Sequence, residues 1–461
     1  MEATAEYERK LEAPEGFELP DLGGEPLEPR VFTSVYHDTP ERSLAHAGLT
    51  LRRRTERGRS VWQLKLPAGD ARLELEEPGG PVGPPQELAR LLTAHLRHGP
   101  VAPVAELRTR RHGALVARDG TTAEVTIDDV AVMDARRVVE EFVEVEVELR
   151  AGKRKELDAI ADALEDAGAK PSDGTPKVFR VLRLPVIEIA PGDALAALRA
   201  RLRLQLREIL ANDPGTRLGR DPESLHDMRV AVRRSRALLR AGSKLYTDDV
   251  SPLAEELRWL GERLGAVRDL DVLLERLRSD VDELDADDRK SGRMLLRTLE
   301  RRRGTARTSL LKALDSDRYF SLLDDVGASI ERLAPSGADL TVADLARREL
   351  KKLRTRVRAA GNDPADDELH ALRKRGKRVR YAYELAGEDA VVKRAKAFQD
   401  VLGEHHDSVV AEATLRGLAT APEKALAAGR LIERERSRKA QARADAPAVL
   451  ATALARGRAA F

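Results

Sequence analysis

Residues 142–149 read FVEVEVEL, a stretch in which valine and glutamate alternate. Successive side chains of a β-strand point to opposite faces, so Glu144, Glu146 and Glu148 share one face and the valines share the other. Shorter runs with the same period-2 alternation occur at 6–10, 49–54, 61–66, 72–76 and 124–128. Turn residues separate the runs, and helical patterns interrupt them at 86–97 and 155–167. We therefore expect the N-terminal half to form a β-sheet.

From Ala194 onward the sequence is rich in Leu, Ala and Arg with a 3.6-residue period, which predicts helices throughout. The change follows the Pro- and Gly-containing segment LPVIEIAPGD at 184–193. LHDMRVAVRRSRALLRAGSKL, from Leu225, is repeated as LHALRKRGKRVRYAYELAG from Leu369. LGAVRDLDV from Leu264 and LGEHHDSVV from Leu402 repeat in the same order. Two motifs at nearly the same offset indicate a duplication, so we expect two similar helical bundles.

Charge is distributed unevenly between the two halves. The chain of 461 residues has 81 Lys+Arg, 79 Asp+Glu and no cysteine. Without cysteine it has no disulfides, Cys-ligated metals or thiol nucleophile. Residues 1–187 hold 27 basic and 34 acidic residues (27 − 34 = −7), whereas 188–461 hold 54 and 45 (54 − 45 = +9). This asymmetry predicts a carboxylate-rich module joined to one that suits polyanions.

Charged residues of both signs share faces of the predicted strands. An ordinary half-exposed sheet would show the same alternation with its charges simply solvated. Like charges two residues apart repel, however, unless something bridges them. Carboxylate groups suit Mg²⁺ and Mn²⁺, and paired arginines and lysines suit phosphate oxygens. The sequence therefore favours a closed antiparallel barrel whose walls hold a metal and a phosphate chain together. The shared faces are Glu6 with Glu8 and Lys10, Arg52 with Arg54, Gln63 with Lys65, Arg72 with Glu74, Arg108 with Arg110, and Glu124 with Asp128.

EYERKL at 6–11 resembles the ExExK signature of the CYTH superfamily, the triphosphate tunnel metalloenzymes. Further runs resemble the same family in order: YHDT at 36–39, LTLRRR at 49–54, WQLKLP at 62–67, ARLELE at 71–76, ELRTRR at 106–111, EVTIDDV at 124–130, VEVEVEL at 143–149 and KVFRVL at 177–182. The resemblance covers residues 2–184. It implies a domain at 1–187 that is an eight-stranded antiparallel β-barrel, whose lumen binds a triphosphate with Mg²⁺ or Mn²⁺.

The resemblance also implies roles for individual residues. Carried over by position, Glu6 and Glu8 would hold metal, with Glu146 and Glu148 opposite. Asp128 resembles the carboxylate near a second metal or the attacking water, with Asp129 as the alternative, and Arg72 with Glu74 would form a salt bridge in the wall. The expected catalytic residues are Lys10, Asp128 and Glu146. The triphosphate would be bound by Lys10, Arg52, Arg54, Lys65, Arg108, Arg110 and Lys177.

The repeated helical motifs each carry a basic stripe. At 100° per residue, His226, Arg229, Arg233, Arg236 and Arg240 fall within a sector about 80° wide. The second repeat places His370, Arg373, Lys377 and Arg380 on the matching stripe. Such a run is commonly a solvated face. Here both copies keep the same phase and neither has i,i+4 acids within the stripe, which indicates that a bound polyanion offsets the repulsion.

These residues resemble the CHAD domain, the conserved histidine α-helical domain, over 194–461. Its histidines would correspond to His226 and His370. The second motif would contribute Arg268, Asp269, His406 and Asp407, with the aspartates orienting the basic residues. Because Arg268 replaces the histidine found at His406, a histidine-specific role there stays open. The resemblance implies two four-helix bundles with a central basic cavity that binds inorganic polyphosphate.

The expected protein is therefore an α+β multidomain chain, with the barrel at 1–187 and the duplicated helical domain at 194–461. We expect a divalent-metal-dependent triphosphatase acting on tripolyphosphate or polyphosphate. The alternatives are a non-enzymatic polyphosphate-binding protein, associated with granules or acting as a scaffold, and a cyclase acting on ATP. Nucleic acid ranks well below polyphosphate as a partner, because aromatic residues for base stacking are few.

The chain opens MEATAEYERK, without the apolar region of a signal peptide, and has no apolar stretch of about 18 uncharged residues. We expect a cytoplasmic protein without a membrane partner, and polyphosphate granules are a candidate association. The sequence predicts no protein partner.

Overall fold

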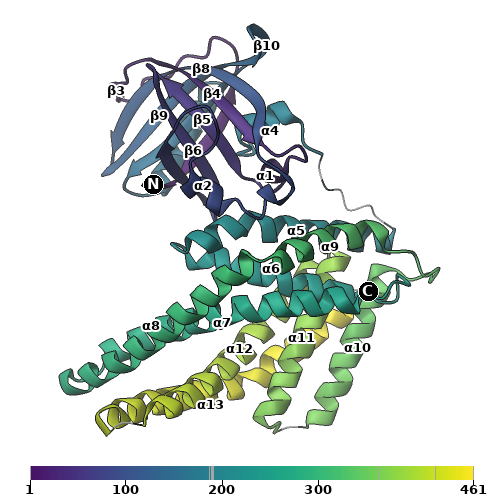
Figure 1. Cartoon of the computed structure of the whole chain (residues 1–461). Helices are drawn as coiled ribbons and strands as arrows, with labels where there is room; N and C mark the ends of the chain where they lie inside the picture. Colours follow the sequence, from purple (N-terminus) through teal and green to yellow (C-terminus); the bar gives the residue numbers. More distant parts are fainter. Residues whose placement is uncertain (1, 186, 188–191, 362, 421, 460–461) are drawn as a thin grey trace. The chain divides into compact units, whose positions relative to one another are not determined.

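The computed structural model describes residues 2–185, 187, 192–361, 363–420 and 422–459 (Figure 1). The chain divides into two compact units. The first, the sheet unit, is Met1–Val186 with Leu210–Asp227, and the second, the helical unit, is Ile187–Ile209 with Met228–Phe461. Helices α5 (Ala194–Leu218) and α6 (Pro222–Ala241) therefore contribute residues to both units. None of the helices in the described ranges is long and apolar enough to cross a membrane.

An antiparallel sheet of eleven strands forms the sheet unit (Figure 1). Its order is β1-β7-β6-β5-β4-β8-β9-β10-β2-β11, with β3 paired to β8. The strands are β1 (Glu2–Glu6), β2 (Glu8–Ala13), β3 (Glu25–Pro26), β4 (Arg30–Asp38), β5 (Thr50–Glu56), β6 (Arg59–Ala68), β7 (Ala71–Pro78), β8 (Ala102–Arg118), β9 (Thr121–Asp134), β10 (Arg137–Ala151) and β11 (Lys170–Pro171).

The N-terminal segment links opposite ends of this sheet. Only Tyr7 separates β1 from β2 in the chain, yet β1 pairs with β7 and β2 pairs with β10. The sheet therefore curls until its two sides meet at one continuous segment. Among the described residues no ladder between β1 and β2 completes the ring, and the strands number eleven. The predicted closed barrel of eight strands is thus not confirmed, although the antiparallel sheet is.

The alternation seen in FVEVEVEL separates the two faces of this sheet. Val145 and Val147 are buried on the outer face, where they pack with helix α3 (Lys155–Asp166) through Leu157 and Ile160. The helix predicted at 155–167 is therefore confirmed. The one predicted at 86–97 is shorter, because α2 (Gln86–Leu91) ends before a 3₁₀ turn at Leu96–His98. Two further short helices are α1 (Ser43–His46) and α4 (Lys177–Leu182).

The helical unit preserves the order of the two repeats. The first stripe lies on α6 and the second on α11 (Asp366–Ala386), while the second motif lies on α7 (Ser251–Asp282) and α12 (Asp389–Leu418). The remaining helices are α8 (Ala286–Leu314), α9 (Asp317–Arg332), α10 (Val342–Ala360) and α13 (Pro422–Ala459).

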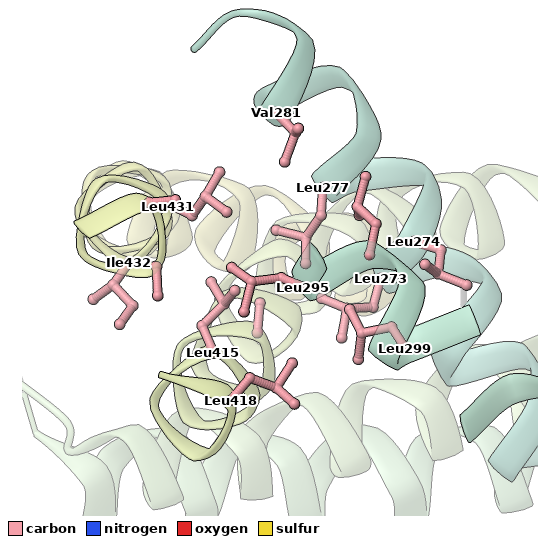
Figure 2. Close-up of a cluster of buried hydrophobic side chains, with 14 of the residues drawn as sticks. Leu273, Leu274, Leu277, Val281, Leu295, Leu299, Leu415, Leu418, Leu431 and Ile432 are labelled. Carbon is pink, nitrogen blue, oxygen red and sulfur yellow. The ribbon is translucent and has the colours of Figure 1, made fainter. Parts of the chain in front are cut away.

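The hydrophobic core of the helical unit joins the repeats. In the cluster of Figure 2, Leu277 of α7 and Leu299 of α8 pack with Leu415 of α12 and Leu431 of α13. A second cluster combines residues of α10, α11, α12 and α13. Helices α12 and α13 thus belong to both clusters, so the predicted pair of separate four-helix bundles is not confirmed.

Candidate functional site

A cavity of about 260 Å³ lies within the curled sheet, and we call it the sheet cavity. Side chains from most strands and from α4 line it, and ionisable groups of both signs predominate. Its carboxylates are Glu6, Glu8, Glu74, Glu76, Asp128, Glu146 and Glu148, and its cations are Lys10, Arg30, Arg52, Arg54, Lys65, Arg72, Arg111, Arg150 and Lys177. The sheet cavity therefore combines donors for a cation with donors for phosphate oxygens.

Most of the site residues predicted for the first half line this cavity. They are Glu6, Glu8, Lys10, Arg52, Arg54, Lys65, Asp128, Glu146, Glu148 and Lys177. Asp129, the alternative to Asp128, is exposed on the outer face. Arg72 and Glu74 line the cavity too, but Arg72 donates to the carbonyl oxygen of Gly48 at 2.9 Å, and not to Glu74.

Two predicted residues, Arg108 and Arg110, lie on the wrong face of the sheet. Both are exposed and line an outer groove, whereas Arg111 lines the sheet cavity. In ELRTRR arginine occurs on both faces of the strand, so period 2 cannot identify the inner one. The pairing of β8 with β4 decides it, because Arg111 stands opposite the inward-facing Arg30. This register is a tertiary property, and the prediction for Arg108 and Arg110 was wrong.

Within the sheet cavity, Arg111 and Lys177 both form ion pairs with the same two carboxylates, Asp128 and Glu146. Arg111 donates to both oxygens of Asp128, at 2.7 and 2.6 Å, and to Glu146 at 2.5 Å. Lys177 donates to Asp128 at 2.7 Å and to Glu146 at 2.8 Å, and it lies 2.9 Å from Glu144. Burial would raise the pKa of Asp128, but the charges of Lys177 and Arg111 hold it below its usual value. Asp128 is therefore an ionised anchor for the two cations.

Helix α4 places Lys177 in the sheet cavity. The helix begins at Lys177, directly after Pro176, and its next residue, Val178, is buried with Tyr36, Leu107 and Val130. That packing fixes the start of the helix and directs the lysine inward. Lys177 was a prediction from family resemblance alone, since no periodicity marks it.

Two arginines of β5 contact neutral groups, although Arg54 also donates to the Glu56 carboxylate at 2.6 Å. Arg52 donates from Nε to Gln63 at 2.7 Å and from Nη1 to the Tyr36 hydroxyl at 3.2 Å. The guanidinium of Arg54 lies 3.8 Å from the centroid of the Phe32 ring. Contacts with amide, hydroxyl and ring orient both guanidinium groups. Their charge is only partly offset by carboxylates, which suits them to phosphate.

The carboxylates of the sheet cavity fit a divalent cation by chemistry. Glu8 and Glu148 stand directly opposite each other on the β2–β10 ladder, and like charges in that position destabilise a sheet. Burial and a hydrogen bond with Glu74 raise the pKa of Glu6 to about 8. One carboxylate oxygen of Glu74 is buried without a hydrogen-bond partner. Oxygens of this kind are the ligands that Mg²⁺ and Mn²⁺ prefer.

The candidate metal ligands Glu6 and Glu148 are at present paired with cationic side chains. Lys65 lies 2.5 Å from Glu6, and Arg150 lies 2.6 Å from Glu148. Within the described part of the chain, no three His, Asp or Glu residues already stand in a metal-binding arrangement. A bound cation would therefore compete with lysine and arginine for the same oxygens.

Further residues that the sequence analysis did not select as site residues also belong to this network, besides Glu74 and Glu76. Arg111, Arg30 and Arg150 line the cavity, as does Arg72, and Glu144 is buried beside Lys10 and Lys177. Glu144 shares the strand face of Glu146 and Glu148, so the alternation of FVEVEVEL was a sufficient signal. Finding the inward arginines required the strand pairing.

In the helical unit, the two basic stripes meet. Arg233 donates from Nε to the Tyr381 hydroxyl at 3.0 Å, and the guanidinium of Arg380 lies 4.8 Å from the centroid of that ring. Burial, and then the charges of Arg373, Arg233 and Arg229, lower the pKa of Lys377 to about 7. We call the set of Arg229, Arg233, Arg373, Lys377 and Arg380 the basic cluster.

Several donors of this region lack acceptors. His370 Nδ1 and Arg373 Nε are buried without a hydrogen-bond partner, whereas Arg380 Nε lies 3.2 Å from the carboxylate of Glu384, an i,i+4 acid that the sequence analysis did not expect. The rings of His370 and His406 stack with centroids 4.2 Å apart, and burial followed by the charge of His370 lowers the pKa of His406 to about 4. Buried donors in folded proteins are nearly always satisfied, so an anion with several oxygens fits this region.

Equivalent glycines make room for equivalent arginines in the two repeats. A Cβ at Gly265 of α7 would lie 3.4 Å from the Arg229 guanidinium, and one at Gly403 of α12 would lie 3.6 Å from that of Arg373. Asp269, next to this contact, pairs with Arg229 at 3.0 Å. The duplicated sequence therefore produces a duplicated geometry at its arginines.

The other predicted residues of the basic half lie elsewhere. Burial and the charge of Arg240 lower the pKa of Arg236, which also faces Glu255 of α7. Arg240 itself is exposed, and Arg268 is half-buried on α7. His226, half-buried on α6, belongs to the residues that group with the sheet unit. The structure therefore does not gather the whole predicted stripe into the basic cluster.

Known proteins resemble both parts of the chain. A CYTH domain matches residues 4–177, and a CHAD domain matches residues 200–416. Uncharacterized proteins from two strains of Mycobacterium tuberculosis are each 34% identical to this chain, over 88% of it and 87% of their own length.

Solved structures resemble parts of the chain. PptA from Streptomyces chartreusis has a TM-score of 0.49 at 25% identity, and covers 56% of this chain and 98% of its own. The CHAD domain from the plant Ricinus communis has a TM-score of 0.48 at 30% identity, covering 59% and 96%. HpAC1 from Hippeastrum, described as having a dominant triphosphatase activity, has a TM-score of 0.27 at 16% identity, covering 40% and 98%. From its two matched domains and its full-length relatives, the chain belongs to the family of proteins that join a CYTH domain to a CHAD domain.

Proposed function

We propose that the sheet unit is a divalent-metal-dependent triphosphatase that hydrolyses inorganic tripolyphosphate or the ends of polyphosphate chains. The carrying observation is the sheet cavity, in which Lys10, Arg52, Arg54, Lys65 and Arg111 share one space with the opposed carboxylates. Membership of the CYTH family supports metal-dependent chemistry on phosphates. That the metal is Mg²⁺ or Mn²⁺ is also part of this proposal.

The cationic side chains would bind the phosphate oxygens and offset the charge that develops on the transferred phosphoryl group. Burial would lower the pKa of Lys10, but Glu146 and Glu144 raise it, so this lysine stays an ammonium donor. Asp128 is a positioning residue in this scheme, because Arg111 and Lys177 occupy both of its oxygens. Water would attack the terminal phosphorus in line with its bond to the bridging oxygen, and that oxygen would leave with the rest of the phosphate chain.

A divalent cation would be held by Glu6, Glu8, Glu146 and Glu148, which line the sheet cavity. Its chemical contribution would be to neutralise the charge of the terminal phosphates. The cavity residues themselves bind and orient the phosphate chain and exclude water. Burial of the cavity walls strengthens each charge interaction made between them.

We propose further that the helical unit binds inorganic polyphosphate through the basic cluster. Support comes from the unsatisfied donors of His370 and Arg373 and from the CHAD match. Carrying both sites on one chain would raise the effective concentration of polymer ends near the triphosphatase. Residues 1–187 and 194–461 remain our proposed domains.

One observation favours a second candidate, a polyphosphate-binding protein without catalysis. The cavity carboxylates that would take a metal already have lysine or arginine partners, as in the pairs Lys65–Glu6 and Arg150–Glu148. Strong internal neutralisation would leave the sheet cavity a passive anion site, and the protein would then act as a granule-associated or scaffold protein.

Phosphate release separates these functions. The full chain is assayed on tripolyphosphate, long-chain polyphosphate, ATP and thiamine triphosphate, with Mg²⁺, with Mn²⁺ and with chelator. We expect metal-dependent release from tripolyphosphate, and loss of it in Glu8→Gln but not in Glu18→Gln, which replaces an exposed residue outside the cavity. If no phosphate is released with either metal, the proposed triphosphatase activity is wrong. Polyphosphate binding retained by the same protein would then support the non-catalytic polyphosphate-binding protein.

A further inference from the structure

Lys377 is a half-buried lysine without an anionic partner. It lies on α11, one turn after Arg373, and in the described ranges no carboxylate stands within ion-pair distance of its Nζ. Its charged neighbours are instead cationic: Arg229 and Arg233 from α6, and Arg373 and Arg380 from its own helix. Two carboxylates of the region pair with arginines, Asp269 with Arg229 and Glu384 with Arg380, and Asp407 of α12 faces Arg373.

This setting favours the neutral amine. Burial and the surrounding arginines lower the pKa of Lys377 to about 7, and the titratable rings of His370 and His406 add charge of the same sign when protonated. At pH 7.5 roughly three quarters of such an amine is unprotonated, against about 0.1% for an ordinary lysine. A less basic amine is also a weaker nucleophile, by roughly fortyfold over this range if it follows the sensitivity of thiols. The larger fraction of neutral amine outweighs this weaker nucleophilicity, so Lys377 should react about twentyfold faster than an ordinary lysine.

The same arginines offer phosphate oxygens a place beside that amine. Arg373 Nε is buried and has no hydrogen-bond partner, on the same helix as Lys377. A guanidinium binds phosphate through paired hydrogen bonds. An electrophile that carries phosphate would therefore be held with its reactive centre near a neutral nucleophile.

We propose that Lys377 is a covalent acylation site for acyl phosphates, whose phosphate group the arginines of the basic cluster bind. The amine nitrogen attacks the carbonyl carbon and forms a C–N bond. The bond from that carbon to the phosphate oxygen breaks, inorganic phosphate leaves with the electron pair, and the amine proton passes to water. The product is an amide that cannot be protonated, so the basic cluster loses the fraction of positive charge that Lys377 carries.

This inference rests on the proposed anion-binding role of the basic cluster only for recognition of the phosphate. It adds a regulatory consequence, because an acylated Lys377 no longer contributes positive charge to polyphosphate binding. Acylation would therefore weaken the binding of a polyanion.

The test uses acetyl phosphate and the full chain at pH 7.5, with acetylation rates at each lysine followed by peptide mass spectrometry. Lys374 is the matched control, since it is exposed on the same helix three residues earlier. We expect Lys377 to react at least about twentyfold faster than Lys374, with a rate that levels off above about pH 8. Long-chain polyphosphate should slow Lys377 and leave Lys374 unchanged.

Phenyl acetate, an uncharged acyl donor, separates reactivity from recognition. The ratio of the two lysine rates should be larger with acetyl phosphate than with phenyl acetate. Equal or slower reaction of Lys377 than Lys374 with acetyl phosphate would overturn the proposal, as would an equal ratio with both donors. Polyphosphate binding is titrated separately on unmodified protein, so a protein that binds polyphosphate without acylation at Lys377 refutes this inference alone.

Discussion

Neighbouring arginines on β8 provide a direct test of the sheet cavity. Arg110 is exposed on the outer face, whereas the Arg111 side chain is 14% exposed and joins Asp128 and Glu146 inside. We consider Arg111→Met and the matched Arg110→Met. Methionine keeps an unbranched apolar side chain that adapts to a partly buried position, so each change removes chiefly the charge and its hydrogen bonds.

The expected losses differ sharply between the two variants. Arg111→Met removes three charge-assisted hydrogen bonds. Breaking a buried ion pair costs about 3–5 kcal/mol, and since Lys177 still serves both carboxylates we expect about 3 kcal/mol of unfolding free energy. If Arg111 also binds phosphate, a lost charged hydrogen bond of about 2–3 kcal/mol lowers kcat/KM by roughly 30- to 150-fold.

Steady-state release of phosphate from tripolyphosphate measures the catalytic effect, at a saturating concentration of the activating metal. Urea denaturation followed by circular dichroism measures stability and shows that each variant is folded under assay conditions. Arg110→Met should stay within about twofold of the original kcat/KM and within about 0.5 kcal/mol in stability, as surface changes usually do.

Equal losses of activity in the two variants, or a larger loss in Arg110→Met, would refute the strand register. A normal kcat/KM in a folded Arg111→Met protein would refute the contact between Arg111 and phosphate, while leaving the register intact. Both outcomes are visible in one set of assays.

Three further results are expected. Gly376→Ala should destabilise the chain by about 1–3 kcal/mol in urea denaturation, because its Cβ would meet an aromatic ring of α12 at 2.8 Å, whereas Gly429→Ala, with nothing within 4 Å, should stabilise it slightly. Burial lowers the pKa of His95 to about 4, so as the pH falls the unfolded chain takes up this proton before the folded chain does. The free energy of unfolding should therefore decrease by up to about 3 kcal/mol between about pH 6.5 and pH 4. This decrease should be absent from the pH profile of His95→Gln. In polyphosphate titrations, Arg373→Gln should weaken binding about tenfold or more, and Lys374→Gln much less. Similar losses of affinity in the two variants would show that the basic cluster is not part of the polyphosphate-binding site.

Periodicity was informative wherever one face of a strand carried one kind of residue. FVEVEVEL separates valines from glutamates, so Glu144, Glu146 and Glu148 could be assigned to one face, and the structure buries the neighbouring valines outside the cavity. ELRTRR carries arginine on both faces. Nothing local distinguished Arg110 from Arg111, and only the partner strand β4 does so.

The helical repeats show the same division. The shared spacing of Arg229 and Arg373 was visible in the sequence and led to the basic cluster. Which helices share a core was not visible, because leucines at helical spacing pack equally well against several partners. The joint core of α7, α8, α12 and α13 follows from contacts far apart in the chain.

By itself, the sequence determined the families, the sheet-then-helix order, the carboxylate faces and the duplicated basic stripe, since each depends on residue type and short-range period. The tertiary structure decided which arginines enter the sheet cavity, that Asp128 anchors two cations, that Lys177 reaches it from α4, and that Lys377 lacks an anionic partner. These four depend on strand register and helix packing, and distances between remote segments are set by folding and not by local pattern.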